Sequence, residues 1–280
     1  MDRRGFMRIF KILNNNAVVV YDGGQEKIVM GKGLAFQKKR NDIVPKNKIE
    51  KIFLLREQSS EKFQQLLATL PEAHIDLAER IISYAEGHLE APLNDHIHIA
   101  LTDHLSFALE RLEQGFPIHN KLTHEIKFLY KKEYEAGLWA KEEIKKVLGV
   151  DIPTDEVAHI ALHIHTAKMD SPSMQESLQT ATVLRDIVEK VEETAGLTIE
   201  ETSINYQRLV THLRYALSRV EEGSQFEPID EDMLELIKMK YSDAFQASEK
   251  VAAFLKAEYS IDFPESEIAY IALHIQRLMK

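Results

Sequence analysis

Two hydrophobic patterns follow one another along the chain, and the first predicts a small β-sheet. Up to about residue 55, short apolar runs alternate with polar turn residues, which is typical of antiparallel strands. Asp22-Gly23-Gly24 favours a hairpin between two of these runs. So small a sheet has a thin core and needs a partner layer, so we expect this head to self-associate. The expected strands are Arg8–Leu13, Ala17–Tyr21, Lys27–Met30 and Ile49–Leu55.

After Ser60 the apolar residues recur at the three-and-four spacing of amphipathic helices. Asn94 is a good N-cap for one of these helices, and Gly115 ends it. Residues 170–173, Asp-Ser-Pro-Ser, interrupt the helical pattern and indicate a linker. Besides the segment from Asn94 to Gly115, the expected helices are Ile75–Leu89, His124–Leu148, Asp155–Lys168, Met174–Thr194, Glu200–Glu222, Asp230–Tyr259 and Glu265–Met279.

An internal repeat divides the helical part of the chain. Residues 151–164, DIPTDEVAHIALHI, recur 111 positions later as residues 262–275, DFPESEIAYIALHI. A second block recurs 108 positions later, in which His104, Arg111 and Gly115 match His212, Arg219 and Gly223. Two blocks with nearly the same offset predict a duplicated helical module of about 110 residues.

These patterns predict a multidomain protein, with a small antiparallel β-sheet domain followed by two all-α helical-bundle domains. The expected domains are residues 1–60, 61–171 and 172–280. The chain contains no cysteine, which excludes disulfides and thiolate metal sites. Because we find neither a long apolar span nor a signal peptide, we expect a cytoplasmic protein.

Charge is distributed unevenly, although the formal net charge is −10. Residues 1–58 hold 13 Lys and Arg against 6 Asp and Glu, and the rest of the chain holds 22 against 39. A basic head on an acidic body suggests that the head binds a polyanion. The alternative is a basic surface that is merely solvated.

Four of the 12 histidines stand out because the repeat carries them in pairs. His104 corresponds to His212, and His163 corresponds to His274. These four residues could be hydrogen-bonded histidines at the edge of a core, which duplication copied. They could also be functional, because a neutral imidazole is a nucleophile that can accept a phosphoryl group. Both interpretations remain open from the residues alone.

Metal or enzyme chemistry finds little support in the sequence. His159 and His163 share a helix face and could hold a metal, but Tyr270 replaces His159 in the second repeat. Phosphate-binding glycine loops and nucleophile elbows do not occur. We interpret most of the acidic residues as lying on solvated helix faces. We therefore expect no metal, no cofactor and no enzymatic activity.

Candidate nucleic-acid contacts lie at two turns of the head. Asn14 to Asn16 end one expected strand, and their amides can read base edges. In residues 31–40, glycines allow close approach of a backbone, Phe36 offers a stacking face, and Lys32 and Lys38 can contact phosphates. An asparagine-rich turn beside a solvated basic loop, with Phe36 in the core, explains the same residues.

Four motifs stand in order along nearly the whole chain: KILNNN at 11–16, GKGLAFQKK at 31–39, LTDH at 101–104, and ALHI at both 161–164 and 272–275. Together they resemble the BglG/SacY/LicT family of transcriptional antiterminators. Residues 93–104, 114–116 and 163–165 resemble the glucose-type branch of that family.

The resemblance implies that the head is a co-antiterminator RNA-binding domain, active as a homodimer, which grips a leader-RNA hairpin and so prevents an overlapping terminator. It also implies two phosphotransferase-system regulation domains, phosphorylated on histidine by the phosphocarrier HPr and a sugar-specific enzyme II. The matching phosphorylation positions are His104, His163, His212 and His274. The implied RNA-binding residues are Asn16, Gly31, Phe36 and Gln37, with Asn14 and Lys32 as helpers and Lys38 as a phosphate contact.

A phosphoryl group would add nearly two negative charges to a packed helix face, where Arg111 and Arg219 are candidate partners. The resemblance implies an antiterminator of a sugar-utilisation or sugar-transport operon, and its glucose-type features lead us to expect that the first module carries the inhibitory sugar signal. One alternative is a DNA-binding sugar-operon activator with the same regulation modules, which would need a helix-turn-helix head. The other is a metabolite-binding or metal-dependent enzyme.

Overall fold

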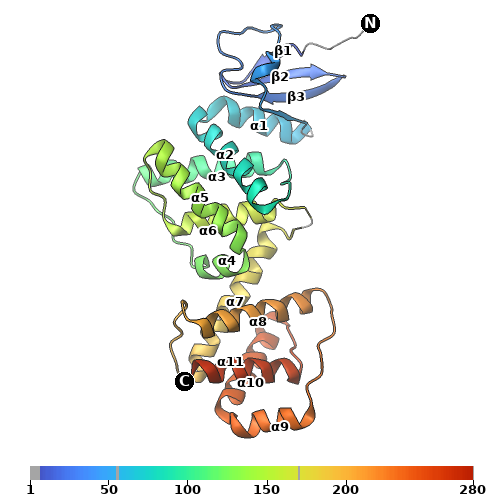
Figure 1. Ribbon diagram of the computed structural model, residues 1–280, viewed down its shortest axis with the longest axis vertical. Coiled ribbons are helices and arrows are strands. Elements are labelled where there is room, and N and C mark those ends of the chain that lie inside the picture. Colours follow the sequence, from blue (N-terminus) through green and yellow to red (C-terminus); the bar gives the residue numbers. More distant parts are fainter. Residues whose placement is uncertain (1–6, 55–56, 170, 280) are drawn as a thin grey trace. The chain divides into compact units, whose positions relative to one another are not determined.

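The computed structural model describes residues 7–54, 57–169 and 171–279. The chain folds as two units, which Figure 1 shows coloured along the sequence. The first unit contains the head and most of the first helical region, over residues 1–120 and 132–171. The second unit contains residues 172–280 together with residues 121–131.

The head is a four-stranded antiparallel sheet in the order β1-β2-β3-β4, as the alternating pattern predicts. β2 and β3 are joined at Gly23 and Gly24, whose φ angles of +59° and +80° fit a hairpin turn that glycine adopts without strain. Residue 55, at the end of the fourth expected strand, lies outside the described residues. The strands are β1 (Ile9–Ile12), β2 (Ala17–Asp22), β3 (Gln25–Met30) and β4 (Lys51–Phe53).

Side chains of β2 alternate between two buried faces of the sheet. Val18 and Val20 point to a small cluster closed by Leu34 and Val44. Ala17 and Val19 point to the other face, and there the second layer comes from helices of the same chain. The residues that cover this face are Phe63 and Leu67 of α1 (Glu57–Thr69), Ile75 of α2 (Glu72–Leu89) and Ile99 of α3 (Ile97–Glu113).

In the first unit, helices follow the sheet, and α1 lies against it (Figure 1). Helix α1 was not predicted from the sequence, whereas α2, α3 and α6 lie within a few residues of their predicted bounds. Gly115 has a φ of +81° just beyond α3, in agreement with its predicted role as a helix stop. The helices are α1 (Glu57–Thr69), α2 (Glu72–Leu89), α3 (Ile97–Glu113), α5 (Lys131–Leu148) and α6 (Thr154–Thr166).

In the second unit, α7 begins where the linker was predicted. The hydroxyl of Ser173 accepts a hydrogen bond from the backbone N–H of Glu176, and the Glu176 carboxylate accepts one from Ser173 N–H. This capping box satisfies free donors at the helix start. The helices are α4 (Thr123–Leu129), α7 (Met174–Ala195), α8 (Ile204–Glu221), α9 (Glu231–Lys240), α10 (Ser242–Tyr259) and α11 (Glu265–Leu278).

Two predictions of long continuous helices were wrong. The segment His124–Leu148 is broken at Tyr130, and Asp230–Tyr259 is broken at Tyr241. Both tyrosines leave the helical region, with φ, ψ of −121°, 53° and −126°, 44°. Neither break contains glycine or proline, and the apolar spacing continues through both. The sequence therefore carries no local signal for either break. Within the described residues, no helix is both long and apolar enough to cross a membrane.

Candidate functional site

Three histidines of the first unit meet between α3 and α6. His104 comes from α3, and His159 and His163 lie one turn apart on α6. The ring centroid of His104 is 4.7 Å from that of His163 and 5.5 Å from that of His159. The structure therefore brings together the two residues that the repeat singled out in this module.

Glu156, in the first turn of α6, anchors this cluster and is only 1% exposed. Its Oε2 lies 3.2 Å from Nε2 of His104, and its Oε1 accepts a hydrogen bond from the guanidinium of Arg111. Burial raises the pKa of Glu156, but contact with His104 and the charges of His104, His159 and Arg111 outweigh burial and lower it. Glu156 is therefore ionised beside His104.

His163 is uncharged at neutral pH. Burial, followed by the charges of His104, His159 and His96, lowers the pKa of His163 to about 3. Burial and the charge of His104 also lower the pKa of His159. A neutral imidazole keeps a lone pair on one ring nitrogen, which is the form that can accept a phosphoryl group.

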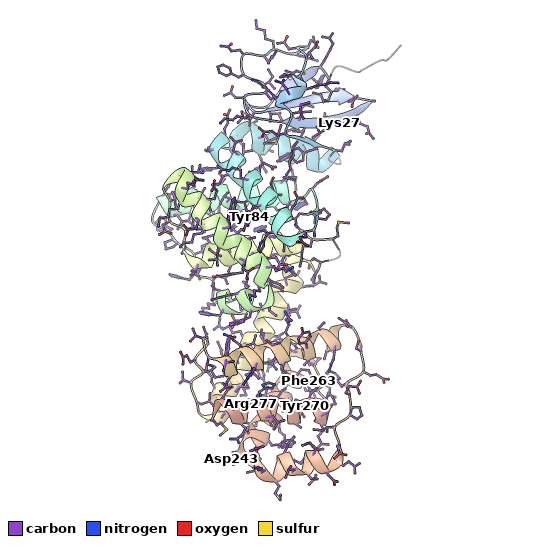
Figure 2. The ribbon with its side chains drawn as sticks, viewed as in Figure 1. Lys27, Tyr84, Asp243, Phe263, Tyr270 and Arg277 are labelled. Atoms are coloured by element: carbon purple, nitrogen blue, oxygen red, sulfur yellow. The ribbon has the colours of Figure 1, made fainter. Side chains whose placement is uncertain are left out.

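The second unit repeats the arrangement between α8 and α11. The rings of His212 and His274 lie 5.1 Å apart. Glu267, 2% exposed, places Oε2 3.1 Å from Nε2 of His212 and Oε1 3.6 Å from a guanidinium nitrogen of Arg219. Tyr270, on α11 in Figure 2, takes the place of the third histidine.

The second histidine of this module is also neutral at physiological pH. Burial, followed by the charges of His212, Arg277 and Arg208, lowers the pKa of His274 to about 4. Both modules therefore pair one histidine that contacts a carboxylate with one that stays uncharged.

Glu156 and Glu267 were not predicted as site residues, because the acidic residues were interpreted as mostly lying on solvated helix faces. That interpretation is wrong for these two, which are buried. They stand at matching positions of the 111-residue repeat, seven residues before His163 and His274. This spacing is the signal that could have found them. Arg111 and Arg219, predicted as partners of a phosphate, contact these carboxylates.

Other histidines have structural partners. His98 is buried against Phe53, and its Nδ1 lies 2.6 Å from the carboxylate of Glu79. His165 lies 3.1 Å from Glu133. Across the part of the chain that the structure describes, no group of three or more His, Asp or Glu side chains is arranged to hold a metal ion.

In the head, backbone hydrogen bonds join the two turns that hold the candidate RNA contacts. Gly31 N–H donates to the carbonyl of Asn16 at 2.9 Å, and Gly33 N–H donates to its side-chain oxygen at 2.7 Å. A Cβ atom on Gly31 would lie 1.7 Å from the carbonyl oxygen of Lys48, so only glycine fits there. Asn14 has a structural contact, because its side-chain amide donates a hydrogen bond to the Leu67 carbonyl at 2.9 Å.

The second turn displays the remaining candidates. Phe36 is 59% exposed, so the alternative that placed it in the core is wrong. Gln37 is also exposed and has a φ of +57°, a left-handed conformation uncommon outside glycine. Lys32 is exposed, and Lys38 is partly exposed. An aromatic face, an amide and cations are therefore exposed on the turn that Gly31 and Gly33 join to Asn16.

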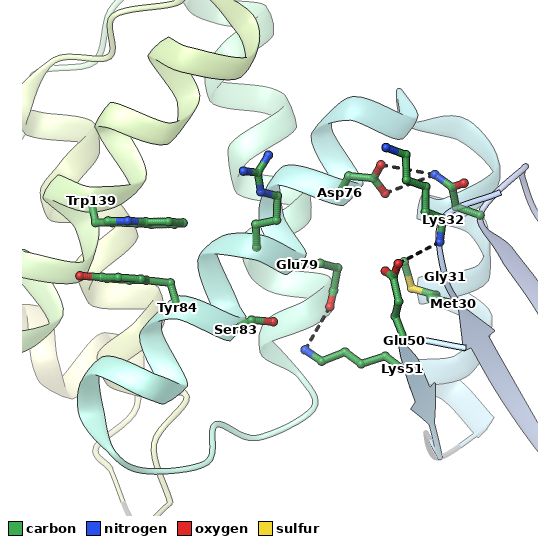
Figure 3. Close-up of a pocket in the computed structure, with 12 residues that line it drawn as sticks. Met30, Gly31, Lys32, Glu50, Lys51, Asp76, Glu79, Ser83, Tyr84 and Trp139 are labelled. Carbon is green, nitrogen blue, oxygen red and sulfur yellow. Dashed lines mark hydrogen bonds and ion pairs between the residues drawn. The ribbon is translucent and has the colours of Figure 1, made fainter. Parts of the chain in front are cut away.

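A pocket of the first unit lies where Asn16, Gly31 and Lys32 approach helix α2 (Figure 3). The amide nitrogen of Asn16 lies 3.3 and 3.4 Å from the two carboxylate oxygens of Asp76. Burial raises the pKa of Asp76, the hydrogen bond from Asn16 lowers it, the charges of Glu72 and Glu50 raise it, and the net effect is upward. The candidate RNA contacts thus face acidic side chains.

The same pocket contains an ion pair and an aromatic pair. Nζ of Lys51 lies 3.2 Å from a carboxylate oxygen of Glu79 (Figure 3). Tyr84 and Trp139 stack with ring centroids 4.0 Å apart and planes within 3°. Trp139 therefore packs against a neighbouring ring.

Comparison with known proteins agrees with this organisation. Residues 7–62 match the CAT RNA binding domain, and residues 79–167 and 185–278 match the PRD domain. The chain is 38% identical to transcription antiterminator LicT of Bacillus subtilis over 276 residues, covering 98% of this chain and 99% of LicT. It is 31% identical to GlcT of Staphylococcus epidermidis over 275 residues, covering 95% of both chains.

A solved structure, the CAT-PRDI part of GlcT, is similar with a TM-score of 0.55 and 34% identity, and it covers 59% of this chain and all of that one. A small sheet domain with two copies of a histidine-bearing helical module defines a class of RNA-binding regulators rather than enzymes. The chain belongs to the BglG/SacY/LicT family of transcriptional antiterminators. The identities do not single out its glucose-type branch, because LicT is more similar than GlcT.

Proposed function

We propose that this chain binds a leader-RNA hairpin, prevents formation of an overlapping terminator in a sugar-utilisation or sugar-transport operon, and is switched by histidine phosphorylation from the sugar phosphotransferase system. The duplicated cluster carries the proposal. In both units a histidine with 19% or 22% of its side chain exposed contacts a buried carboxylate and lies beside a neutral histidine. Duplicated core histidines would not require a buried acid paired with an arginine at each copy.

The phosphorylated residues in this proposal are His104 and His163 in the first module and His212 and His274 in the second. Their phosphoryl donors are HPr and a sugar-specific enzyme II, in the cytoplasm. Adding nearly two negative charges beside Glu156 or Glu267 repels the carboxylate and offers Arg111 or Arg219 a stronger partner. Such a rearrangement between packed helices would bias a homodimer between two states.

RNA binding belongs to residues 1–60 in the proposal, and the regulation modules occupy residues 61–171 and 172–280. Asn16, Gly31, Lys32, Phe36, Gln37 and Lys38 contact the RNA, and Asn14 holds the first turn in place. The joined turns, the exposed Phe36 ring and the match to an RNA-binding domain support this assignment. The match also favours RNA over the DNA-binding alternative, which needs a helix-turn-helix head.

A terminator–reporter assay with single alanine variants of the four histidines tests the switch. His104→Ala and His163→Ala should give antitermination without sugar, and His212→Ala and His274→Ala should have smaller effects. Circular dichroism melts show whether each variant remains folded. Unchanged sugar dependence in all four folded variants would refute the switch.

A further inference from the structure

In each unit the first histidine contacts a buried glutamate, so the same contact is present in both copies of the module. The distance from carboxylate to Nε2 is 3.2 Å for Glu156 and His104 and 3.1 Å for Glu267 and His212. Burying a carboxylate is costly unless ionic or hydrogen-bonding partners compensate. The contact with histidine is therefore one of the interactions that stabilise each buried carboxylate.

Helix geometry explains why the same contact forms twice. The glutamate precedes the second histidine by seven residues on one helix, and the arginine follows the first histidine by seven residues on the facing helix. Seven residues are close to two turns, so each pair lies on one helix face. One carboxylate oxygen contacts the arginine, which leaves the other directed at the histidine. The sets are Glu156, His163, His104 and Arg111, and Glu267, His274, His212 and Arg219.

We propose that Glu156 and Glu267 are positioning residues for phosphoryl transfer to His104 and His212. The inference rests on the proposed function, in which these histidines are acceptors. The two atoms lie at ion-pair distance without the angle of a hydrogen bond, and a negative charge 3.1–3.2 Å from Nε2 favours electrostatically the tautomer that carries its proton there. The lone pair then lies on Nδ1, so Nδ1 is the atom that receives the phosphoryl group.

The transfer balances without release of a proton from the acceptor. The lone pair on Nδ1 of His104 attacks the phosphorus of a phosphohistidine on the carrier protein. A new N–P bond forms as the carrier's N–P bond breaks, and the carrier's imidazole nitrogen keeps the electron pair. The ring of His104 gains positive charge, which Glu156 balances across Nε2–H. A carboxylate already positioned next to the positive charge that develops on the ring lowers the barrier to phosphoryl transfer.

Two observations on the full-length chain test this role. Histidine is labelled with ¹⁵N, and the protein is phosphorylated with purified HPr recharged from phosphoenolpyruvate by enzyme I. Long-range ¹H–¹⁵N spectra identify the tautomer before the reaction and the phosphorylated nitrogen after it. Peptide mass spectrometry then gives the rate at each histidine in the wild type and in Glu156→Gln and Glu267→Gln. Each variant controls for the other, because the substitutions lie in different units.

The wild type should show Nε2–H tautomers and Nδ1-phosphohistidine at both His104 and His212. Glu156→Gln should slow phosphorylation of His104 roughly ten- to a hundredfold and leave His212 unchanged, and Glu267→Gln should do the reverse. A purely structural role would lower the melting temperature without changing the tautomer.

Phosphorylation at Nε2 in the wild type would overturn the positioning role and leave the proposed function intact. This measurement does not depend on whether the variants fold. An unchanged rate at the adjacent histidine in a folded variant would also overturn the positioning role. Absence of phosphohistidine at all four positions of the wild type would instead refute the phosphorylation switch, and the positioning role with it.

Discussion

Removing the carboxylate of Asp76 should strengthen RNA binding by the full-length chain. Both of its oxygens lie 3.3–3.4 Å from the side-chain nitrogen of Asn16, and Glu72 accepts a hydrogen bond from the backbone N–H of Asn15 at 3.0 Å. If Asn16 reads a base, RNA must displace the first contact and bring its phosphates near these carboxylates. The acidic edge of α2 therefore opposes RNA binding.

The size of the effect follows from the two contributions that Asp76 makes. Its hydrogen bond with Asn16 is worth about 0.5–1.5 kcal/mol net. Repulsion between unit charges about 4 Å apart in water adds about 1 kcal/mol. Because Asp76 is exposed and solvent and salt screen its charge, the sum of about 1.5–2.5 kcal/mol falls to about 1–2 kcal/mol, so Asp76→Ala should bind RNA roughly five- to thirtyfold more tightly. Asp76→Asn keeps an amide beside Asn16 and should gain less.

Fluorescence anisotropy with a labelled leader hairpin at fixed salt measures this change. Glu249→Ala is the matched control, because it removes an exposed carboxylate of the second unit and changes the net charge equally. Asp76→Ala affinity no higher than that of Glu249→Ala would refute the reasoning. It would show that Asn16 does not have to leave Asp76 when RNA binds.

Three further predictions concern the head and the first module. Phe36→Ala should weaken RNA binding by about 1–3 kcal/mol if the ring stacks on a base, with little change in the melting temperature, because the ring is exposed. Log affinity measured against log salt should fall with a slope of about −0.7 to −0.9 per phosphate contacted. The pKa of His163 is about 3 in the folded chain, below its ordinary value near 6.5. As pH falls between these two values, the unfolded chain binds a proton at His163 before the folded chain does, so the free energy of unfolding should decrease. Urea unfolding at several pH values should show a shallower fall for His163→Ala.

The sheet was predictable because strand signals are local. Asp22-Gly23-Gly24 fixes a hairpin, and alternating residues of β2 fill two faces. The source of the second layer was not predictable in this way. Helix α1 covers one face through Phe63 and Leu67, and this contact depends on tertiary packing rather than on any strand signal.

The helix breaks show where periodicity is insufficient. Tyr130 and Tyr241 carry no glycine or proline signal, and the apolar spacing remains in phase across both. Tertiary contacts accompany the first break, since Phe128 of α4 packs against Tyr206 and the hydroxyl of Tyr130 donates to the Ser177 carbonyl at 3.2 Å. The local pattern predicts which residues favour a helix. It does not predict where tertiary contacts break that helix.

Part of the site was predictable because the repeat compares the chain with itself. The pairing of His104 with His212 and of His163 with His274 came from matched spacing alone, and the structure brings each module's two histidines together. Burial of Glu156 could not be predicted from residue type, because an acid on an amphipathic helix usually faces solvent. It is buried here because His104 and Arg111 provide compensating partners.

The coupling of histidine phosphorylation to RNA binding is the central claim, and one titration tests it most directly. The full-length chain is titrated with the leader hairpin before and after phosphorylation by HPr and enzyme II, with the modified residues mapped by mass spectrometry. The account predicts phosphoryl groups on His104, His163, His212 or His274 and a changed RNA affinity, with no response in a variant that carries alanine at all four positions. Equal affinity of the phosphorylated and unphosphorylated forms, or an undiminished response in the folded four-alanine variant, would contradict it.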